Sequence, residues 1–505
     1  MTPFLAEIQK HVINQPKELS LVGQGLCFTY EKLWKLAGSY ARELKARGCK
    51  RGEVVAASIG NHPYHVIAFL SVTMAGGVFL PMDVPMPAGR REEILKDAKV
   101  RFVITPKDLE EHTLETPYCD ETPADDNSAA YLVYTSGSTG KPKGVLVAHR
   151  GYLPMLKAQQ KAFRIGSSSR SLLTLSVCFD ASLSDIGVPL IAGATLYVEP
   201  KNIVRSPRRL VQTIREHGLT HLDLPPALLS VIPPTTMPGC VETIVFGGEP
   251  ALPETVRKWA KRFRMVNVYG PTEATICASL CVCDATKWKE PLLGSPLPHV
   301  LFDVINKDGK PAKEGEEGEL HIGGPAVALG YINKPELTEE RFYEKNGTPF
   351  YCTGDIVRLL EDSNFIFLGR NDEQVKIGGV RLQLEEVEVC LRSHEKVKRS
   401  AVIKRNNKLE AFVVCRSEIS ESELRHHLAE SLPRALIPTT FHFLKSLPET
   451  SSGKVDKSVL KKSSLASTSK ESMPSTLERE LCLIFTKVLG RTVYSDSDYN
   501  EIGGT

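Results

Sequence analysis

A short polar loop between two apolar runs places the strongest constraint on the fold. Residues 135–144 hold three glycines, four hydroxyl side chains and two lysines, and the flanking runs 132–134 and 145–147 are apolar. Glycine lets backbone N–H groups approach an anion closely, hydroxyls donate hydrogen bonds and lysines add positive charge. The segment predicts a polyphosphate-binding loop, with an ordinary flexible turn as the alternative. The residues expected to contact phosphate are Thr135, Ser136, Gly137, Ser138, Thr139, Gly140, Lys141 and Lys143.

This loop is not a Walker A loop. That motif needs Gly five positions before the Gly-Lys pair and Ser or Thr directly after it, but Thr135 and Pro142 occupy those positions. Pro142 also disfavours a helix that contains Lys141 in its first turn. The loop is therefore expected to join two strands.

Composition narrows the class of protein. The chain has 505 residues and is 42% apolar, which predicts several domains with packed cores. Its net charge is only +3, and no basic stripe interleaved with aromatic residues occurs, so nucleic acid is not an expected partner. The twelve cysteines are scattered, and the closest group, Cys277, Cys281 and Cys283, has no second ligand group at metal-site spacing. Free intracellular thiols are expected.

Neither a signal peptide nor a membrane span is expected. The first ten residues include an acidic residue and lack an apolar core of signal-peptide length. The most apolar stretch, residues 66–82, is interrupted by Gly76 and Gly77 and is too short to span a bilayer. The sequence therefore predicts a cytoplasmic protein, expected to be monomeric, without a membrane partner.

Helical spacing of apolar residues alternates with β-rich runs through the first half of the chain. This alternation predicts an α/β protein with largely parallel sheets covered by helices. The predicted helices are 4–13, 31–46, 92–98 and 208–217; the predicted strands are 54–59, 100–105, 172–177, 195–198, 219–224 and 243–246; and the segment 75–83 ends a helix and begins a strand.

A second motif, Y-G-P-T-E at residues 269–273, carries groups suited to a nucleotide. Tyr269 offers an aromatic face for a base, Thr272 a hydroxyl for phosphate, and Glu273 a carboxylate able to hold Mg²⁺. By itself this motif could equally be an ordinary Gly-Pro turn. Its presence together with the phosphate loop favours a nucleotide site.

Eight motifs in order give the chain a family resemblance. It resembles the adenylate-forming superfamily, which includes acyl-CoA synthetases, firefly luciferase and the adenylation domains of nonribosomal peptide synthetases, and it is most similar to the last. The motifs are F-T-Y-E-K-L (28–33), the phosphate loop, F-D-A-S (179–182), Y-G-P-T-E (269–273), G-E-L-H-I-G-G-P (318–325), Y-C-T-G-D (351–355), G-R-N-D-E-Q-V-K (369–376) and P-E-T-S-S-G-K-V-D-K (448–457).

The resemblance implies a fold and a reaction. The implied fold has a large N-terminal domain of mostly parallel sheets layered with helices (1–372), and a small mobile α+β domain (373–464) with helices at 385–393 and 422–431 and strands at 400–404 and 411–415. In the implied reaction a carboxylate and ATP form an acyl-adenylate and pyrophosphate, and a thiol then forms a thioester. The implied cofactors are ATP and Mg²⁺.

The resemblance also implies roles for individual residues. Lys454 would be the catalytic lysine that bridges substrate and nucleotide, Glu273 would hold Mg²⁺, and Thr135 and Thr272 would contact phosphate during the reaction. Gly248, Glu249, Asn267 and Tyr269 would surround adenine, Asp355 with Arg370 would hold the ribose, and Asp372 would be the hinge between the two domains. Two positions depart from the family pattern: Gly378 and Leu329 stand where Arg is usual.

The implied substrate pocket is lined by Phe179, Asp180, Ala181, Ser184, Asp223, Val245, Gly247, Val268, Ile276, Cys277 and Lys454. Asp180 would pair with an α-ammonium group, with a helix N-cap as its alternative role. Ser184 and Gly247 would leave space. Asp223 beside an apolar wall favours a cation. We therefore expect a basic amino acid (lysine, ornithine or arginine), with an aromatic amino acid carrying a polar tip as the alternative.

The C-terminal part predicts a carrier domain. Residues 465–475 form an apolar-poor linker, and residues 476–505 contain an amphipathic helix and end in E-I-G-G-T, which resembles the opening of a phosphopantetheine carrier domain just before its attachment serine. A native helical tail is the alternative. The expected partner is thus a carrier domain in a longer chain, of an initiating or single-module synthetase. The alternative functions are a free-standing acyl-CoA ligase for an acid without an amine and a silent binding or scaffold module.

Overall fold

The computed structural model describes residues 1–84, 86–110, 112, 118–120, 127–137, 141–360, 364–371, 374–377, 380–405, 408–448 and 455–462. The chain divides into two compact units, Met1–His394 with Ser422–Ile437, and Glu395–Glu421 with Pro438–Thr505. The two units are described separately below. Among the described residues, no helix is long and apolar enough to cross a membrane.

The first sheet of the large unit carries the phosphate-loop motif. Its strand order is β17-β7-β6-β4-β3-β5. The strands β3, β4, β5 and β6 run parallel, whereas β7 pairs antiparallel with β6 and with β17. Their bounds are Val54–Ser58 (β3), Val78–Met82 (β4), Phe102–Ile104 (β5), Ala129–Thr135 (β6), Lys143–Ala148 (β7) and Gly330–Tyr331 (β17).

The second sheet has the order β14-β13-β12-β11-β10-β8-β9-β1-β2, and the run from β12 to β1 is parallel. Both sheets confirm the predicted parallel strands. The bounds are Leu19–Gly23 (β1), Leu26–Thr29 (β2), Arg170–Leu173 (β8), Thr195–Val198 (β9), His221–Asp223 (β10), Thr243–Gly247 (β11), Arg264–Tyr269 (β12), Ser279–Val282 (β13) and Ser295–Pro296 (β14).

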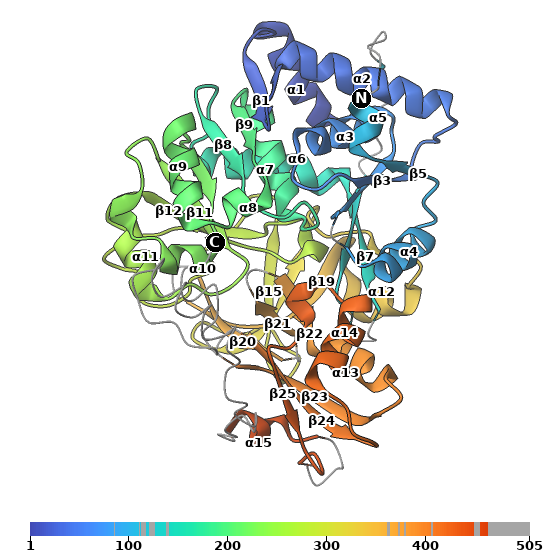
Figure 1. The fold of residues 1–505 in the computed structure, drawn as a ribbon. Coiled ribbons are helices and arrows are strands. Elements are labelled where there is room, and N and C mark those ends of the chain that lie inside the picture. Colours follow the sequence, from blue (N-terminus) through green and yellow to red (C-terminus); the bar gives the residue numbers. More distant parts are fainter. Residues whose placement is uncertain are drawn as a thin grey trace, which may run out of the picture. The chain divides into compact units, whose positions relative to one another are not determined.

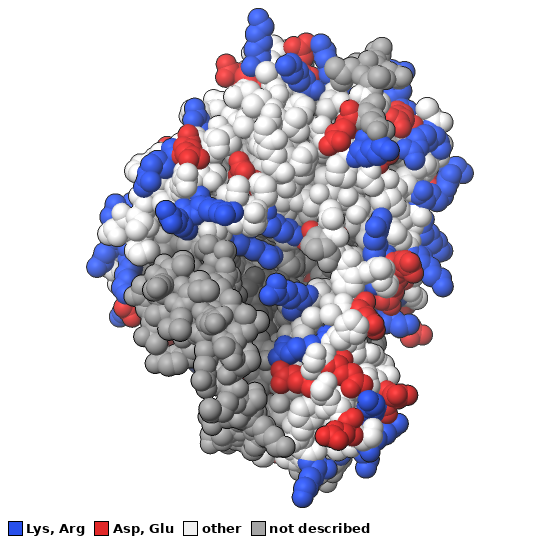
Figure 2. All heavy atoms as spheres, in the orientation of Figure 1, with Lys and Arg blue, Asp and Glu red and all other residues white. Residues whose placement is uncertain are grey.

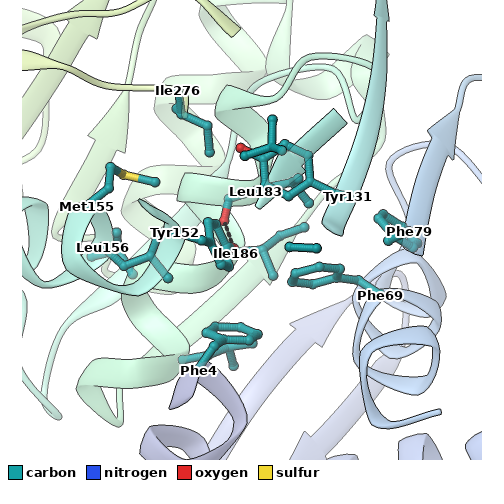
Figure 3. Packing of buried hydrophobic residues seen from close by; sticks show 14 of the residues in the cluster. Phe4, Phe69, Phe79, Tyr131, Tyr152, Met155, Leu156, Leu183, Ile186 and Ile276 are labelled. Carbon is teal, nitrogen blue, oxygen red and sulfur yellow. Dashed lines mark hydrogen bonds between the residues drawn. The ribbon is translucent and has the colours of Figure 1, made fainter. Parts of the chain in front are cut away.

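Helices α1, α3, α6 and α7 form the core layer of the large unit. Eleven residues of the twelve-residue helix α3 are buried, in agreement with its mainly apolar sequence. Figure 3 shows Phe4, Phe69, Tyr131 and Tyr152 converging in this core, where the Tyr152 hydroxyl donates to Leu183 O at 2.7 Å. The same cluster takes in residues of both parallel sheets. The bounds are Pro3–Asn14 (α1), Pro63–Met74 (α3), His149–Phe163 (α6) and Ala181–Ala192 (α7).

Other helices of this unit are labelled in Figure 1, and those at residues 30–46, 88–97, 207–217, 384–393 and 421–431 confirm predicted segments, whereas the rest were not predicted. They are Tyr30–Ala46 (α2), Ala88–Asp97 (α4), Pro106–Glu110 (α5), Lys201–Val204 (α8), Pro207–His217 (α9), Pro226–Val231 (α10), Pro253–Ala260 (α11), Pro335–Arg341 (α12), Leu384–Ser393 (α13) and Glu421–Ser431 (α14), the last of which starts in the smaller unit.

A third sheet was not predicted. It is antiparallel throughout, in the order β15-β16-β19-β18 with β20 on β19, so the parallel character applies to only two of the sheets. The period-two pattern of burial in β16 is typical of such a sheet. The bounds are Leu301–Ile305 (β15), Glu317–Gly323 (β16), Phe342–Lys345 (β18), Thr348–Leu359 (β19) and Phe365–Arg370 (β20); the hairpin Gln374–Ile377 (β21) with Val380–Gln383 (β22) follows.

The smaller unit contains the described strands β23-β24-β25 and helix α15. Strands β23 (Val397–Arg405) and β24 (Lys408–Cys415) are antiparallel, and β25 (Thr440–Phe443) is parallel to β24. The two strands predicted here are confirmed. Helix α15 spans Lys457–Lys462.

Candidate active site

The phosphate-loop motif lies in a β-hairpin. Strands β6 and β7 pair antiparallel, with Thr135 opposite Lys143, which confirms the predicted strand–loop–strand arrangement. The Oγ1 atom of Thr135 is buried and has no hydrogen-bond partner within the part of the chain that the structure describes. Lys141 is exposed, and Ser136 Oγ accepts a hydrogen bond from Gln383 N at 3.1 Å. Ser138, Thr139 and Gly140 lie outside the described residues.

Lys143 joins this hairpin to the Y-G-P-T-E motif. Its Nζ atom donates to Glu273 Oε1 at 3.1 Å and to the Tyr331 hydroxyl at 2.9 Å, and that hydroxyl donates to Glu273 Oε1 at 2.8 Å. Glu273 is fully buried on the turn Thr272–Ala274. The three groups form a closed hydrogen-bonded set next to the loop. The sequence analysis did not indicate Tyr331, although Leu329, two positions earlier, was noted as a departure from the family pattern.

Backbone strain follows directly after Glu273. Thr275 and Ile276 both have positive φ angles, 53° and 68°. This conformation is costly for a β-branched residue such as Ile276, and it occurs mostly where the surrounding structure imposes it at a functional site. The positive φ angles of Thr275 and Ile276 therefore indicate that this turn belongs to a functional site.

One cavity gathers all four residues predicted to surround adenine. Gly248, Glu249, Asn267 and Tyr269 all line it. Asn267 Nδ2 donates to Leu292 O at 2.8 Å, which fixes its side chain. Four apolar side chains that no motif indicated also line this cavity, namely Phe246, Trp288, Leu293 and Phe367.

The predicted ribose residue Asp355 lies beside this cavity. Tyr269 donates to Asp355 Oδ2 at 2.5 Å, and Arg370 pairs with Oδ1 and donates to Thr353 O at 2.9 Å. Burial and the Asp355 carboxylate raise the pKa of Tyr269 well above its usual value, so the phenol stays a hydrogen-bond donor. Each Asp355 oxygen has a second lone pair for a further donor.

Helix α7 begins at the F-D-A-S motif. Asp180 is its N-cap, and its Oδ1 accepts from Ala181 N at 2.8 Å, so the alternative role expected from the sequence is present. Asp180 also lies close enough to Tyr131 to raise the pKa of that phenol, in addition to the larger effect of burial. A capping role and a substrate role are compatible because a carboxylate has two oxygens. Phe179 and Ala181 flank this position.

A second cavity brings together three of the predicted pocket residues. Ser184 from α7, Asp223 from β10 and Val245 from β11 all line it. Ser184 Oγ donates to Gln159 Oε1 at 2.5 Å. The predicted residues Val268, Ile276 and Cys277 do not line this cavity, and the last two are buried in the core. Burial raises the pKa of Cys277 to about 12.

The interpretation of Gly247 needs correction. This glycine was expected to leave space for substrate, but a Cβ atom at Gly247 would lie 2.3 Å from Val268 O. The two residues are paired between β11 and β12. Close approach of the neighbouring strand therefore requires glycine here, whatever the pocket holds.

Comparison with known proteins decides the family. Residues 8–332 match the AMP-binding enzyme family, and residues 386–454 match the AMP-binding enzyme C-terminal domain. The chain belongs to the AMP-binding enzyme family.

Relatives refine this assignment. A linear gramicidin synthase of Brevibacillus parabrevis is 34% identical over 474 residues, which cover 90% of this chain and 6% of that protein. Tyrocidine synthase 1 from the same organism is 31% identical over 94% of this chain and 46% of its own length. This AMP-binding enzyme therefore spans less than half the length of these relatives. The chain is thus similar to one portion of each of these longer synthases.

Solved structures share the fold. The artificially fused adenylation–PCP di-domain NpsA-ThdA from Klebsiella oxytoca has a TM-score of 0.79 at 24% identity, over 98% of both chains. The Vibrio cholerae adenylation domain AlmE, solved with glycyl-adenosine-5′-phosphate, has a TM-score of 0.81 at 22% identity, over 91% of this chain and 97% of that one. The predicted adenylate-forming fold is confirmed.

Three further predicted positions of this AMP-binding enzyme, Lys454, Asp372 and Gly378, lie outside the described residues. Leu329 is exposed and directly precedes β17, and its backbone N–H donates to Leu146 O of β7 at 2.8 Å. Figure 2 shows acidic and basic side chains interspersed over the described surface of the face in view.

Proposed function

We propose that this chain activates a basic amino acid as its adenylate and passes it to the phosphopantetheine thiol of a carrier domain. The observation that carries the choice of substrate is the environment of Asp223. It lines the cavity beside Ser184 and Val245, and among the described residues neither a cation nor a hydrogen-bond donor reaches its carboxylate. A carboxylate against an apolar wall gains most from a cationic partner.

In the first step, a carboxylate oxygen of the amino acid attacks the α-phosphorus of ATP. The bond from that phosphorus to the bridging oxygen breaks, and pyrophosphate leaves with the electron pair. Negative charge moves from the substrate carboxylate to pyrophosphate, so donors fixed along this path lower the barrier. We assign Lys143, Thr135 and Thr272 to the phosphates and Lys454 to the bridge between carboxylate and nucleotide.

Glu273 fits a magnesium ligand. Mg²⁺ takes oxygen ligands and is usually held by one or two carboxylates together with substrate phosphates. Among the described residues no group of three or more potential ligands exists, so we propose that phosphate oxygens complete the coordination together with Glu273. Mg²⁺ supplies neutralisation of phosphate charge when bound. Lys143, which now pairs with Glu273, would turn toward phosphate in its presence.

The remaining residues orient the two substrates. We propose that Tyr269, Asn267, Gly248 and Glu249 hold adenine and that Asp355, fixed by Arg370, accepts from the ribose hydroxyls. Asp180 would hold the α-ammonium group with the carboxylate oxygen that does not cap α7. In this arrangement the amino acid carboxylate would lie between Asp180 and the residues that hold the nucleotide.

Transfer to a carrier is supported by two observations. Similar proteins include adenylation–PCP fusions, and residues 476–505 resemble the start of a carrier domain. We propose the division 1–372, 373–464, 465–475 and 476–505, with Asp372 as the hinge about which the small domain turns between the two half-reactions.

Amino-acid-dependent pyrophosphate exchange, measured over the common amino acids and ornithine, tests the proposal. We expect exchange with at least one basic amino acid and a requirement for Mg²⁺. Exchange only with aromatic amino acids would contradict the proposed basic substrate but would agree with the proposed adenylation reaction. Absence of exchange with every amino acid would overturn the proposed reaction.

A further inference from the structure

We propose that Asp185 and Ser171, together with Asp223, bind the charged end of the substrate side chain, which makes Asp185 a second specificity-determining carboxylate. This rests on the proposed function and names the part of the pocket that selects the substrate. Neither Asp185 nor Ser171 was indicated by any motif in the sequence.

Strands β8, β10 and β11 form one wall of the site. In the parallel sheet, Ser171 of β8 pairs with His221 of β10, and Asp223 of β10 pairs with Val245 of β11. Since side chains alternate along a strand, His221 and Asp223 lie on the same face as their partners. All four residues line the second cavity described above.

Helix α7 supplies the opposite wall. Ser184, Asp185 and Val188 line the same cavity. Asp185 Oδ2 accepts from Thr174 N at 3.2 Å, from Thr174 Oγ1 at 3.4 Å and from Leu175 N at 3.4 Å. Among the described residues no donor reaches Oδ1. One oxygen therefore anchors the carboxylate to the end of β8, and the other is available to a ligand.

The polar groups of this cavity lack a cation. Within the described ranges no Lys, Arg or His forms an ion pair with Asp185 or Asp223. The Ser171 hydroxyl is buried, at 6% exposure, and has no hydrogen-bond partner there. A buried polar group without a partner costs free energy, so a ligand that supplies N–H donors would be stabilised by this wall.

Electrostatics agree with this geometry. Burial raises the pKa of Asp185, and the neighbouring Asp223 raises it further. Burial raises the pKa of Asp223 to about 7. His221 does not neutralise them, because Nδ1 lies 2.7 Å from Thr220 Oγ1, Nε2 lies 3.0 Å from Phe163 O, and burial lowers the pKa of His221.

The lining defines the class of side chain. Phe163, Ile165 and Val188 provide apolar walls, and the acceptors come from Asp185, Ser171 and Asp223. This combination suits an alkyl stem that ends in a nitrogen cation. Ammonium and guanidinium share that chemistry, so lysine, ornithine and arginine are separate arms of the test.

The test compares pyrophosphate exchange in the full chain for the wild type, Asp185→Asn, Ser171→Ala and the exposed control Asp284→Asn. Each is assayed with lysine, ornithine and arginine, and with norleucine and citrulline as neutral counterparts. For Asp185→Asn we expect KM for the preferred basic amino acid to rise about 10- to 100-fold, as loss of a charge-assisted hydrogen bond implies, with kcat little changed. KM for the neutral counterpart should not rise. Ser171→Ala should raise the ratio of KM for the basic amino acid to KM for its neutral counterpart by a smaller factor.

The outcomes separate this inference from the proposed function. Absence of exchange with any amino acid overturns the function itself. Exchange with neutral or aromatic amino acids but with no basic one overturns the inference and leaves adenylation intact. An equal loss for basic and neutral substrates in Asp185→Asn shows a structural role and overturns it as well. If Asp185→Asn does not fold, Ser171→Ala decides, because an unchanged basic-to-neutral ratio in that variant overturns the shared site.

Discussion

Lys143 Nζ lies 3.1 Å from Glu273 Oε1, and both groups contact the Tyr331 hydroxyl. This pair joins the end of the phosphate loop to the turn that carries the proposed magnesium ligand. Both side chains are almost fully buried. Removing one partner would leave the other charge buried and unpaired, which typically costs about 3–5 kcal/mol, so the pair is expected to control both stability and catalysis.

Glu273→Gln should lower the rate of adenylation by about 10²- to 10³-fold, because it removes the carboxylate that we propose holds Mg²⁺ at the phosphates. The magnesium dependence of pyrophosphate exchange is the measurement, and the concentration needed for half-maximal rate should rise. The exposed Glu290→Gln variant is the control. An unchanged magnesium requirement would argue against Glu273 as a ligand.

Tyr331→Phe should destabilise the large unit by about 1–3 kcal/mol, because Glu273 and Lys143 each lose a hydrogen-bond partner. The ring remains, and so does the contact of Lys143 Nζ at 4.3 Å from its centroid. Urea unfolding measures the difference. Tyr64→Phe is the matched control, since the Tyr64 hydroxyl makes no hydrogen bond within the described residues. Equal stability of the two variants would contradict the prediction.

Asp355→Asn should raise KM for ATP by about tenfold, because an amide accepts ribose hydroxyls with one oxygen only. The same variant should discriminate less against 2′-deoxy-ATP and 3′-deoxy-ATP than the wild type does. Steady-state kinetics with the three nucleotides measure this difference. A parallel rise in KM for all three would mean that Asp355 does not contact the ribose.

Lys454→Ala should lower kcat for adenylate formation by about 10²-fold or more, because the charge it would neutralise develops in the transition state. The control is Lys461→Ala, an exposed lysine of α15. Single-turnover adenylate formation is the measurement. Wild-type activity in Lys454→Ala would overturn the mechanism proposed above.

Affinity for a basic amino acid should increase as pH rises. Burial holds the pKa of Asp223 at about 7, so below that pH the group is a neutral acid and above it a carboxylate. The facing groups are Asp185 on α7, whose pKa is also raised, His221 on the same strand, whose pKa is lowered, and Cys277, whose pKa is about 12. The last two stay neutral near pH 7.

The measurement is KM for the preferred basic amino acid between about pH 6 and about pH 8, where the Asp223 carboxylate forms. We expect KM to fall across this range in the wild type and to stay nearly constant in Asp223→Asn. A neutral substrate should show no such fall. A fall of the same size in Asp223→Asn would assign the titration to another group.

The sequence was sufficient for features that depend on local chemistry. Pro142 excluded a helix after the phosphate loop, and the hairpin followed. The antiparallel third sheet was not predicted because residues 318–325 were interpreted only as a family motif, although polar and apolar residues alternate there as in a half-buried strand. Gly247 was misread because only the pairing of β11 with β12 reveals that Val268 O occupies the space of its missing side chain.

Asp185 and Ser171 were not predicted for the same reason. Asp185 in isolation is one polar position inside an apolar helix, and Ser171 is one position in a short strand. Their relation exists only because β8 and β10 are adjacent in the sheet although fifty positions separate Ser171 from His221 in the chain. Such order of strands is set by tertiary packing and not by local propensity.

Helix α7 starts with its cap at Asp180 and carries Asp185 five residues later. At a rise of about 1.5 Å per residue and about 3.6 residues per turn, the two aspartates are separated by about 7.5 Å along the helix axis and by about 140° around it. If one holds the α-ammonium group and the other the end of the side chain, a rigid element of the scaffold fixes the distance between the two positive charges of the substrate. Discrimination between shorter and longer basic amino acids then becomes a question of length.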